Sequence, residues 1–138
     1  NAKALARALK EEGLDVQGDP SVSYTETHQV IVRVGYAQGC EIARRLEQNN
    51  IIGNFQAIPG DEGFTASSAL RLGVSEMTRF GMKEKDFRAF APLFAEAVKG
   101  GRKVADEVAK FRQGFQEMHY CFQEGEIASF KERFLKTF

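Results

Sequence analysis

The spacing of apolar positions predicts alternating helices and strands over residues 1–99. Apolar residues three and four apart predict helices at 1–12, 38–49 and 83–99. Short runs rich in Val, Ile and Leu predict strands at 14–16, 29–34, 51–53 and 69–74. Turn residues gather at 18–20 and 59–63. We therefore expect an α/β two-layer sandwich, with helices on a short sheet that is antiparallel or mixed.

Several residues are expected to shape the helix ends. Asn1 suits the N-cap of the first helix, and Gly13 suits the left-handed position that follows it. Ser75 is expected to cap a short turn that ends at Gly81. Pro92 should kink the 83–99 helix or mark its first turn, because proline cannot donate a helical hydrogen bond.

Residues 100–138 form a separate helical tail in this prediction, and six of the twelve phenylalanines lie in it. Steps of four and three, as in a helix seam, link Val104, Val108, Phe111, Phe115, Met118 and Phe122. After a break near Gly125, the apolar face continues with Phe130, Phe134 and Phe138. One interpretation is a helical hairpin lying on its own domain. The other is a docking surface for another domain or subunit, because so large an aromatic face is costly to expose.

Composition narrows the class of protein. The chain has 138 residues, 43% of them hydrophobic, with 19 basic and 19 acidic side chains. The balanced charge makes a nucleic-acid partner unexpected, and the absence of a long apolar run makes a membrane protein unexpected. Two cysteines and two histidines offer neither a disulfide framework nor a metal-ligand cluster. We expect a cytoplasmic domain, and the helical start at Asn1 suggests a piece of a longer chain.

Common catalytic motifs are absent from the sequence. It has no glycine-rich phosphate loop, zinc-protease helix motif or nucleophile elbow. Cys40 follows a glycine near an expected helix start, but no histidine is close enough in sequence to act as its base. His28 is interpreted as a strand-entry residue and His119 as a rim residue of the tail. Asp61 and Glu62 lie in an expected exposed turn and are weak acid–base candidates.

Arg71 is the one candidate that the pattern singles out, because it interrupts the apolar strand 69–74. A buried guanidinium needs a carboxylate, backbone carbonyls or water as its partner. Pattern alone allows a structural ion pair. It also allows a clamp for a substrate carboxylate, which the planar guanidinium can bind through two parallel hydrogen bonds. Gly73, two residues further on, would let a ligand approach closely.

The sequence around Arg71 resembles that of the serine hydroxymethyltransferases. Residues 68–73 and 77–82 (SALRLG and MTRFGM) are similar to the family segment SGIRLGTPALTTRGM. Residues 28–32 resemble the family strand NHLVLV, residues 53–59 the segment VNKNAIP, and residues 82–87 the helix start GMKEEDF. Residues 1–6 resemble the helix that opens the family's C-terminal domain. These landmarks cover about residues 1–99, in the order that the family has them.

The resemblance implies the small C-terminal domain of a fold-type I pyridoxal-phosphate enzyme with the aspartate-aminotransferase-like fold. In such enzymes a large domain holds the cofactor on a lysine, and the small domain closes the active site. The family transfers the hydroxymethyl carbon of serine to tetrahydrofolate, leaving glycine, usually as dimers or tetramers. Arg71 stands where the family has the arginine that binds the substrate α-carboxylate. The chain alone is then expected to be inactive.

The sequence departs from the family pattern on the folate side. Gln56 replaces the second Asn of VNKNAIP, which contributes to folate binding, and Phe55 replaces the preceding Lys. The loop after Pro59 is also shorter than in the family. Three hypotheses follow. The first is a hydroxymethyltransferase in which Gln56 still donates an amide hydrogen bond to folate, and the second is a folate-independent aldolase or transaldolase for β-hydroxy amino acids. The third is a non-catalytic interaction module. Thr78 and Arg79 match the family motif and are interpreted as structural.

Overall fold

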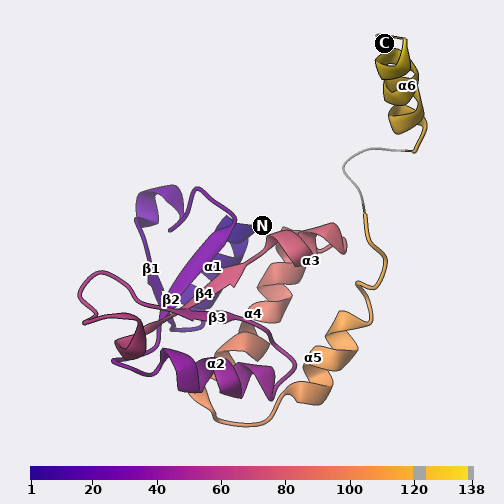
Figure 1. Cartoon of the computed structure of the whole chain (residues 1–138). Helices are drawn as coiled ribbons and strands as arrows, with labels where there is room; N and C mark the ends of the chain where they lie inside the picture. Colours follow the sequence, from indigo (N-terminus) through magenta and orange to yellow (C-terminus); the bar gives the residue numbers. More distant parts are fainter. Residues whose placement is uncertain (120–123, 137–138) are drawn as a thin grey trace.

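A computed structural model of the chain describes residues 1–119 and 124–136 (Figure 1). The helices are α1 (Ala2–Glu11), α2 (Gly39–Glu47), α3 (Ser75–Arg79), α4 (Glu84–Lys99), α5 (Ala105–Arg112) and α6 (Glu124–Leu135). The strands are β1 (Asp15–Gln17), β2 (Gln29–Arg33), β3 (Asn54–Gln56) and β4 (Ala69–Gly73). Two 3₁₀ turns lie at Pro20–Val22 and Phe64–Ala66.

The strands form one four-stranded sheet in the described part of the chain, in the order β1-β2-β4-β3. Every neighbouring pair is antiparallel. Strand β4 therefore lies inside the sheet, with Arg71 paired to Ile31 of β2 on one side and to Asn54 of β3 on the other. The predicted α/β sandwich is confirmed, and the sheet is antiparallel.

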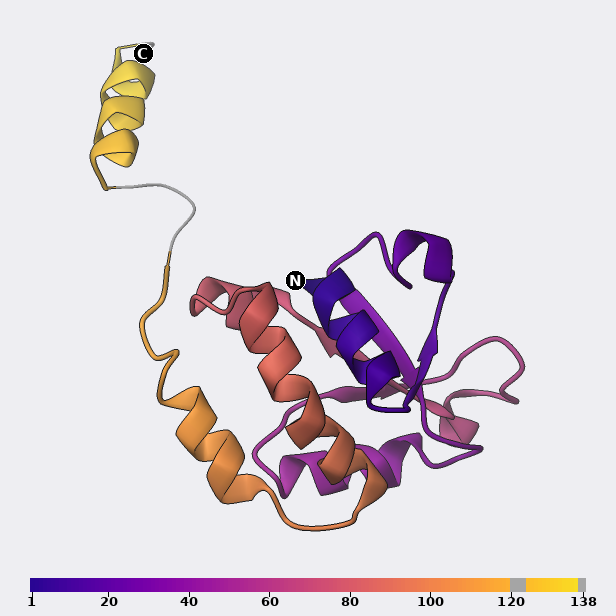
Figure 2. The ribbon, with the colours of Figure 1, turned by 180° about the vertical axis from the view of Figure 1, so that it is seen from behind.

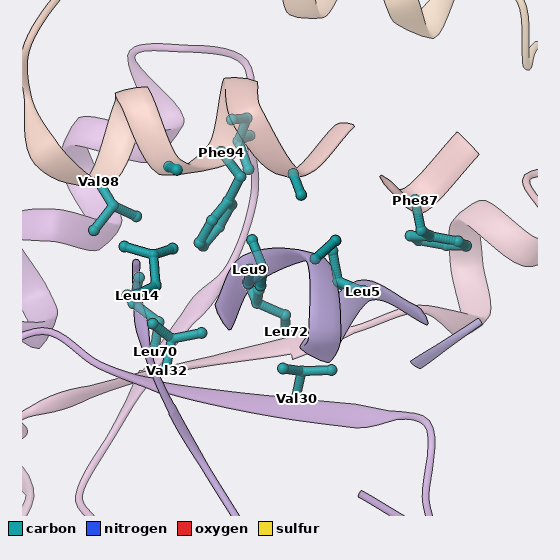
Figure 3. Packing of buried hydrophobic residues seen from close by; sticks show 14 of the residues in the cluster. Leu5, Leu9, Leu14, Val30, Val32, Leu70, Leu72, Phe87, Phe94 and Val98 are labelled. Carbon is teal, nitrogen blue, oxygen red and sulfur yellow. The ribbon is translucent and has the colours of Figure 1, made fainter. Parts of the chain in front are cut away.

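One face of the sheet carries the hydrophobic core. Side chains from the strands, among them Val30, Val32, Leu70 and Leu72, pack against α1, α2 and α4. Figure 3 shows Leu5 and Leu9 of α1 and Phe94 of α4 over the strand residues. Phe94, Leu9 and Leu70 are completely buried. Because side chains alternate along a strand, the residues between these face the other side of the sheet.

The third strand is displaced from its predicted position. We expected residues 51–53, but β3 begins at Asn54. The amide of Ile51 donates to the carbonyl of Leu46 at 2.9 Å, so this residue closes the end of α2 and is buried. Ile52 is 91% exposed. Two consecutive isoleucines therefore gave a strand signal where the chain makes a turn, with Asn50 at a φ of 61°.

Asn1 and Gly13 occupy their predicted positions at the ends of α1, whereas Ser75 does not cap α3, because Val74 is the N-cap residue of that helix. Asn1 is the N-cap residue of α1, but its side chain makes no capping hydrogen bond. Ser75 is the first residue of α3 and also makes none. Gly13 has the predicted left-handed conformation, with a φ of 80°.

Pro92 lies inside α4 and does not mark its first turn, which begins at Glu84. The proline is exposed, and so is Arg88, whose carbonyl lacks its usual helical partner because proline has no N–H. Water can therefore satisfy that carbonyl.

The tail divides into two parts with different surroundings. Helix α5 packs on α4 through a row of rings, with centroid distances of 6.2 Å for Phe94–Phe90, 5.9 Å for Phe90–Phe111 and 5.3 Å for Phe111–Phe115. Helix α6 stands away from the rest in both views (Figures 1 and 2). The tail residues Cys121, Phe122 and Phe138 lie outside the described residues. The division between 1–99 and 100–138 stays a prediction.

Within residues 1–119 and 124–136, no helix has the length and apolar character needed to cross a membrane.

Candidate functional site

The face of the sheet opposite the core is polar and is called the open face below. It carries both predicted site residues, Arg71 and Gln56. Arg71 lies on this face because its neighbours Leu70 and Leu72 point into the core. Its cross-strand partners Ile31 and Asn54 share the face. Arg71 is half-buried in the middle of this surface. A side chain on an interior strand is held by a ladder on each side, so this position is well fixed.

The Arg71 guanidinium has no partner in the described part of the chain. No hydrogen bond, ion pair or ring contact reaches it from residues 1–119 or 124–136. The structural ion pair that the sequence allowed is therefore not formed with these residues. Its direct neighbours Ile31 and Asn54 are uncharged, so the positive charge is not neutralised across the strands. A guanidinium without a partner can bind an anionic group that comes from outside this domain.

A second arginine on the same face has different surroundings. Arg33 of β2 lies directly opposite Asp15 of β1, and it also acts electrostatically on Asp61. Arg33 is exposed, and acidic neighbours lie on two sides of it. The open face thus offers two cations, of which Arg33 has acidic groups nearby and Arg71 does not.

Gln56 lies on the same face as Arg71. It pairs with Ala69, which is two residues before Arg71 on β4, and residues two apart on a strand share a face. Diagonal cross-strand neighbours have Cα atoms about 7–8 Å apart. The half-buried amide of Gln56 is therefore within reach of a ligand held by Arg71. The structure brings together the two site residues that the sequence singled out.

Asn54 lies beside Arg71 at the candidate site, and the sequence did not single it out. It is the direct cross-strand partner of Arg71 and is exposed on the open face. Its place in the segment similar to VNKNAIP was a signal that could have identified it. Its carboxamide can donate or accept a hydrogen bond beside the guanidinium.

Asp61 organises the loop that joins β3 to β4. Its carboxylate accepts hydrogen bonds from the Ser68 hydroxyl at 2.7 Å, the Ser68 amide at 3.0 Å and the Ile58 amide at 2.9 Å. These bonds, first among them the one from the Ser68 side chain, hold the pKa of the Asp61 carboxyl below its usual value, and Arg33 adds to the effect. Asp61 is thus a structural anion, and both ends of the loop are held next to Gln56 and β4.

The remaining candidates lie away from the Arg71 face or are used in the fold. Cys40 is half-buried as the second residue of α2. His28 is exposed before β2, and its carbonyl accepts from the Val74 amide. His119 donates its amide to the carbonyl of Arg79. Glu62 accepts from the Tyr36 hydroxyl at 3.0 Å. No group of three metal-ligating side chains occurs among the described residues.

The described residues do not form a binding site for pyridoxal phosphate. That cofactor is held on a lysine, yet all four strands lack lysine and every lysine in the described ranges is exposed. None of these ammonium groups is desolvated on the face that carries Arg71. Among residues 1–119 and 124–136, a lysine placed to hold the cofactor is therefore lacking.

Comparisons with known proteins agree with this architecture. The family model "Serine hydroxymethyltransferase" matches residues 1–94. The serine hydroxymethyltransferase of Pyrobaculum aerophilum is 44% identical over 126 residues, and that of Sulfolobus acidocaldarius is 39% identical over 139 residues. The solved structure of L-threonine transaldolase from Pseudomonas fluorescens superposes with a TM-score of 0.77 at 37% identity.

The fold is that of the small α/β domain found in enzymes with the aspartate-aminotransferase-like fold. More specifically, the chain belongs to the serine hydroxymethyltransferase family.

The matches cover most of this chain but only about a third of the longer proteins. The Pyrobaculum match covers 89% of this chain and 29% of its relative, and the Sulfolobus match 96% and 32%. The transaldolase match covers 94% of this chain and 31% of the other. The family implies pyridoxal phosphate as the cofactor of these enzymes. The greater part of each relative lies outside the matched region.

Proposed function

We propose that this chain is the small C-terminal domain of a pyridoxal-phosphate enzyme in which Arg71 binds the α-carboxylate of the amino-acid substrate. The observation that carries the proposal is the half-buried guanidinium of Arg71, which has no partner among the described residues and uncharged cross-strand neighbours. The parent reaction is the transfer of the serine hydroxymethyl carbon to tetrahydrofolate. The parent enzyme is cytoplasmic and a homodimer or tetramer.

Arg71 contributes binding and orientation. A guanidinium can donate two parallel hydrogen bonds to a carboxylate, which fixes both the position of the substrate and its rotation. The substituents on Cα then take fixed directions, and orientation decides which bond is aligned for cleavage. Pyridoxal phosphate, held by a larger domain of the same polypeptide, supplies the electron sink for that cleavage. In this proposal the open face of the sheet is covered by that larger domain, and the isolated chain is inactive.

A second candidate is a folate-independent aldolase or transaldolase of the same family. Gln56 and Phe55 stand where the family has Asn and Lys, and the β3–β4 loop is short. The superposition on an L-threonine transaldolase supports this candidate as well. The carboxylate clamp serves both reactions, because both begin from a β-hydroxy amino acid. Product analysis separates them. Glycine formed from serine only with tetrahydrofolate supports the first candidate. Acetaldehyde released from threonine without tetrahydrofolate supports the second, together with glycine for an aldolase or with a new β-hydroxy amino acid made from an added aldehyde for a transaldolase.

The test uses the full-length polypeptide loaded with cofactor and compares two arginines on one face. We expect Arg71→Lys to weaken the binding of serine and glycine by roughly tenfold to a hundredfold, because a single ammonium cannot reproduce the two parallel hydrogen bonds. Arg33→Lys is the matched control. It changes a cation that has Asp15 and Asp61 as neighbours, so amino-acid affinity should stay the same. Calorimetric titration measures both affinities.

Two results would contradict the clamp. Unchanged serine affinity in both Arg71→Lys and Arg71→Ala would remove the role of Arg71. An equal loss in the Arg33→Lys control would show that the effect is not specific to the guanidinium of Arg71. A full-length protein that binds no amino acid at all would instead favour a non-catalytic interaction module.

A further inference from the structure

The C-terminal arm, here residues 113–119 together with α6, is anchored at a defined place on the domain. Its anchor is the turn that follows α3. The amide of His119 donates to the carbonyl of Arg79, and the Arg79 guanidinium lies 2.9 Å from the sulfur of Met118. The guanidinium of Arg112, the last residue of α5, lies 4.4 Å from the centre of the Phe80 ring. The arm therefore leaves the domain from this turn.

Gly81 is required for this anchor. Its φ is 92°, and a Cβ atom built there would lie 3.1 Å from the imidazole ring of His119. A side chain at this position would strain the backbone and displace the arm. The sequence resemblance includes this glycine, but its contact with the tail becomes visible only in the structure.

The start of the chain lies at the same place. The side-chain amide of Asn1 donates to the Thr78 hydroxyl at 2.8 Å and to the carbonyl of Met82 at 3.0 Å. Figures 1 and 2 both show the N-terminus beside α3, on the side of the domain toward which α6 extends. Strand β4, which carries Arg71, also runs directly into α3. A domain joined before residue 1 would thus meet both the arm and the end of the Arg71 strand.

Helix α6 presents an apolar stripe toward solvent. Ile127 and Phe130 are three residues apart and therefore lie on one side of the helix, with exposed fractions of 39% and 70%. Phe134, four residues further on, continues this side and is 59% exposed. A helix face with aromatic groups this exposed is typical of a surface that another element covers.

The matches to the transaldolase structure and to the Sulfolobus relative extend into the α6 segment. A match that ended before α6, at residue 123, would cover less than nine-tenths of the 138 residues. The match to the transaldolase structure covers 94% of this chain, and the match to the Sulfolobus relative covers 96%. Coverage that high includes part of α6. The same proteins have about two-thirds of their length outside the match. Part of the α6 segment is therefore matched in proteins that contain a large additional body.

We propose that the α6 stripe docks on the larger domain of the same polypeptide, so that the arm holds the two domains together. This inference rests on the proposed function, which supplies that domain. The arm base, the chain start and the end of β4 all meet at α3, so the arm leaves this domain where a domain joined before residue 1 would begin. The occupant is apolar, because the stripe offers Ile and Phe side chains.

The test is hydrogen exchange measured by mass spectrometry on the full-length polypeptide without substrate. We expect the amides of α6 to be protected in the wild type. Phe130→Ser and Ile127→Ser should each speed exchange in α6 by about tenfold or more, because docking would keep the helix formed, while α4 is unchanged. Glu132→Ser is the matched control, since Glu132 lies on the same helix but away from the stripe, and it should leave exchange as it is.

Cross-linking from Lys131 identifies the occupant. The experiment uses a mixture of copies labelled with nitrogen-14 and copies labelled with nitrogen-15. We expect Lys131 to be cross-linked to the segment outside residues 1–138, and the two linked peptides to carry the same isotope, which shows that they come from one copy. Linked peptides that carry different isotopes would show that a second copy covers the stripe, and this result would overturn the proposal. Rapid exchange of α6 in the wild type would overturn it as well. Hydrogen exchange and cross-linking are both measured without a bound amino acid. Loss of amino-acid binding by Arg71 would therefore not change either result, and the two proposals can fail separately.

Discussion

The two faces of the sheet come from the same strands but have opposite surroundings. On the core face, Leu70 and Val32 are completely buried under helices. On the open face, the residues next to them in sequence are Arg71, which is half-buried, and Arg33, which is exposed. Since side chains alternate along a strand, one five-residue segment supplies both the packing and the candidate site. The comparison teaches that stability and binding can be changed separately at adjacent positions.

The largest expected effect separates the two faces by stability. We expect Leu70→Ala to lower the free energy of unfolding by about 2–5 kcal/mol, because a fully buried leucine is replaced by a cavity. The neighbouring change, Arg71→Ala, should lower it by less than about 1 kcal/mol, because its guanidinium has no partner in the described part of the chain. Urea unfolding of the full-length protein measures both. Equal losses would show that Arg71 supports the fold.

A smaller effect is expected at two glycines. A Cβ atom at Gly39, the first residue of α2, would lie 2.8 Å from the Ser67 carbonyl oxygen and 3.0 Å from that of Ala69. Gly39→Ala should therefore cost about 1–3 kcal/mol of unfolding free energy, although alanine favours helices. At Gly73 the nearest atom would be 4.0 Å away, in the His28 side chain. Gly73→Ala should change stability by less than about 0.5 kcal/mol.

The outcome at these glycines sharpens the comparison of the faces. If Gly39→Ala were neutral by thermal or urea unfolding, the junction between α2 and β4 would be looser than the distances indicate. If Gly73→Ala were as costly as Gly39→Ala, the end of β4 would not be open to a ligand.

The fold was largely predictable because its signals are local. The helix periodicity of α1, α2 and α4 and the apolar runs of β2 and β4 come from neighbouring residues. The third strand failed because Ile51 and Ile52 look like a strand in sequence, whereas Ile51 closes α2. Nothing local distinguishes these two uses of an isoleucine pair.

The candidate site was predictable only in part. The interrupted strand pointed to Arg71, and the family resemblance pointed to Gln56, but their shared face follows from the register of β3 on β4. That Asp15 lies opposite Arg33 and not Arg71 is likewise a matter of register between β1 and β2. Whether a cation is neutralised depends on such pairing, which composition and spacing along the chain do not determine.

The smallest expected effect concerns Asp61, whose hydrogen bonds hold the loop beside the open face. Its pKa is lowered in the folded protein, so its ionised form stabilises the fold above the ordinary carboxyl range, and this stabilisation is lost as the pH falls through the folded pKa. We expect the unfolding free energies of the wild type and Asp61→Asn to differ at neutral pH and to converge at pH values below about 4. Glu26→Gln, at an exposed carboxylate, is the control and should leave the pH profile unchanged. A constant difference between wild type and Asp61→Asn from neutral to acidic pH would mean that the carboxylate charge has no part in holding the loop.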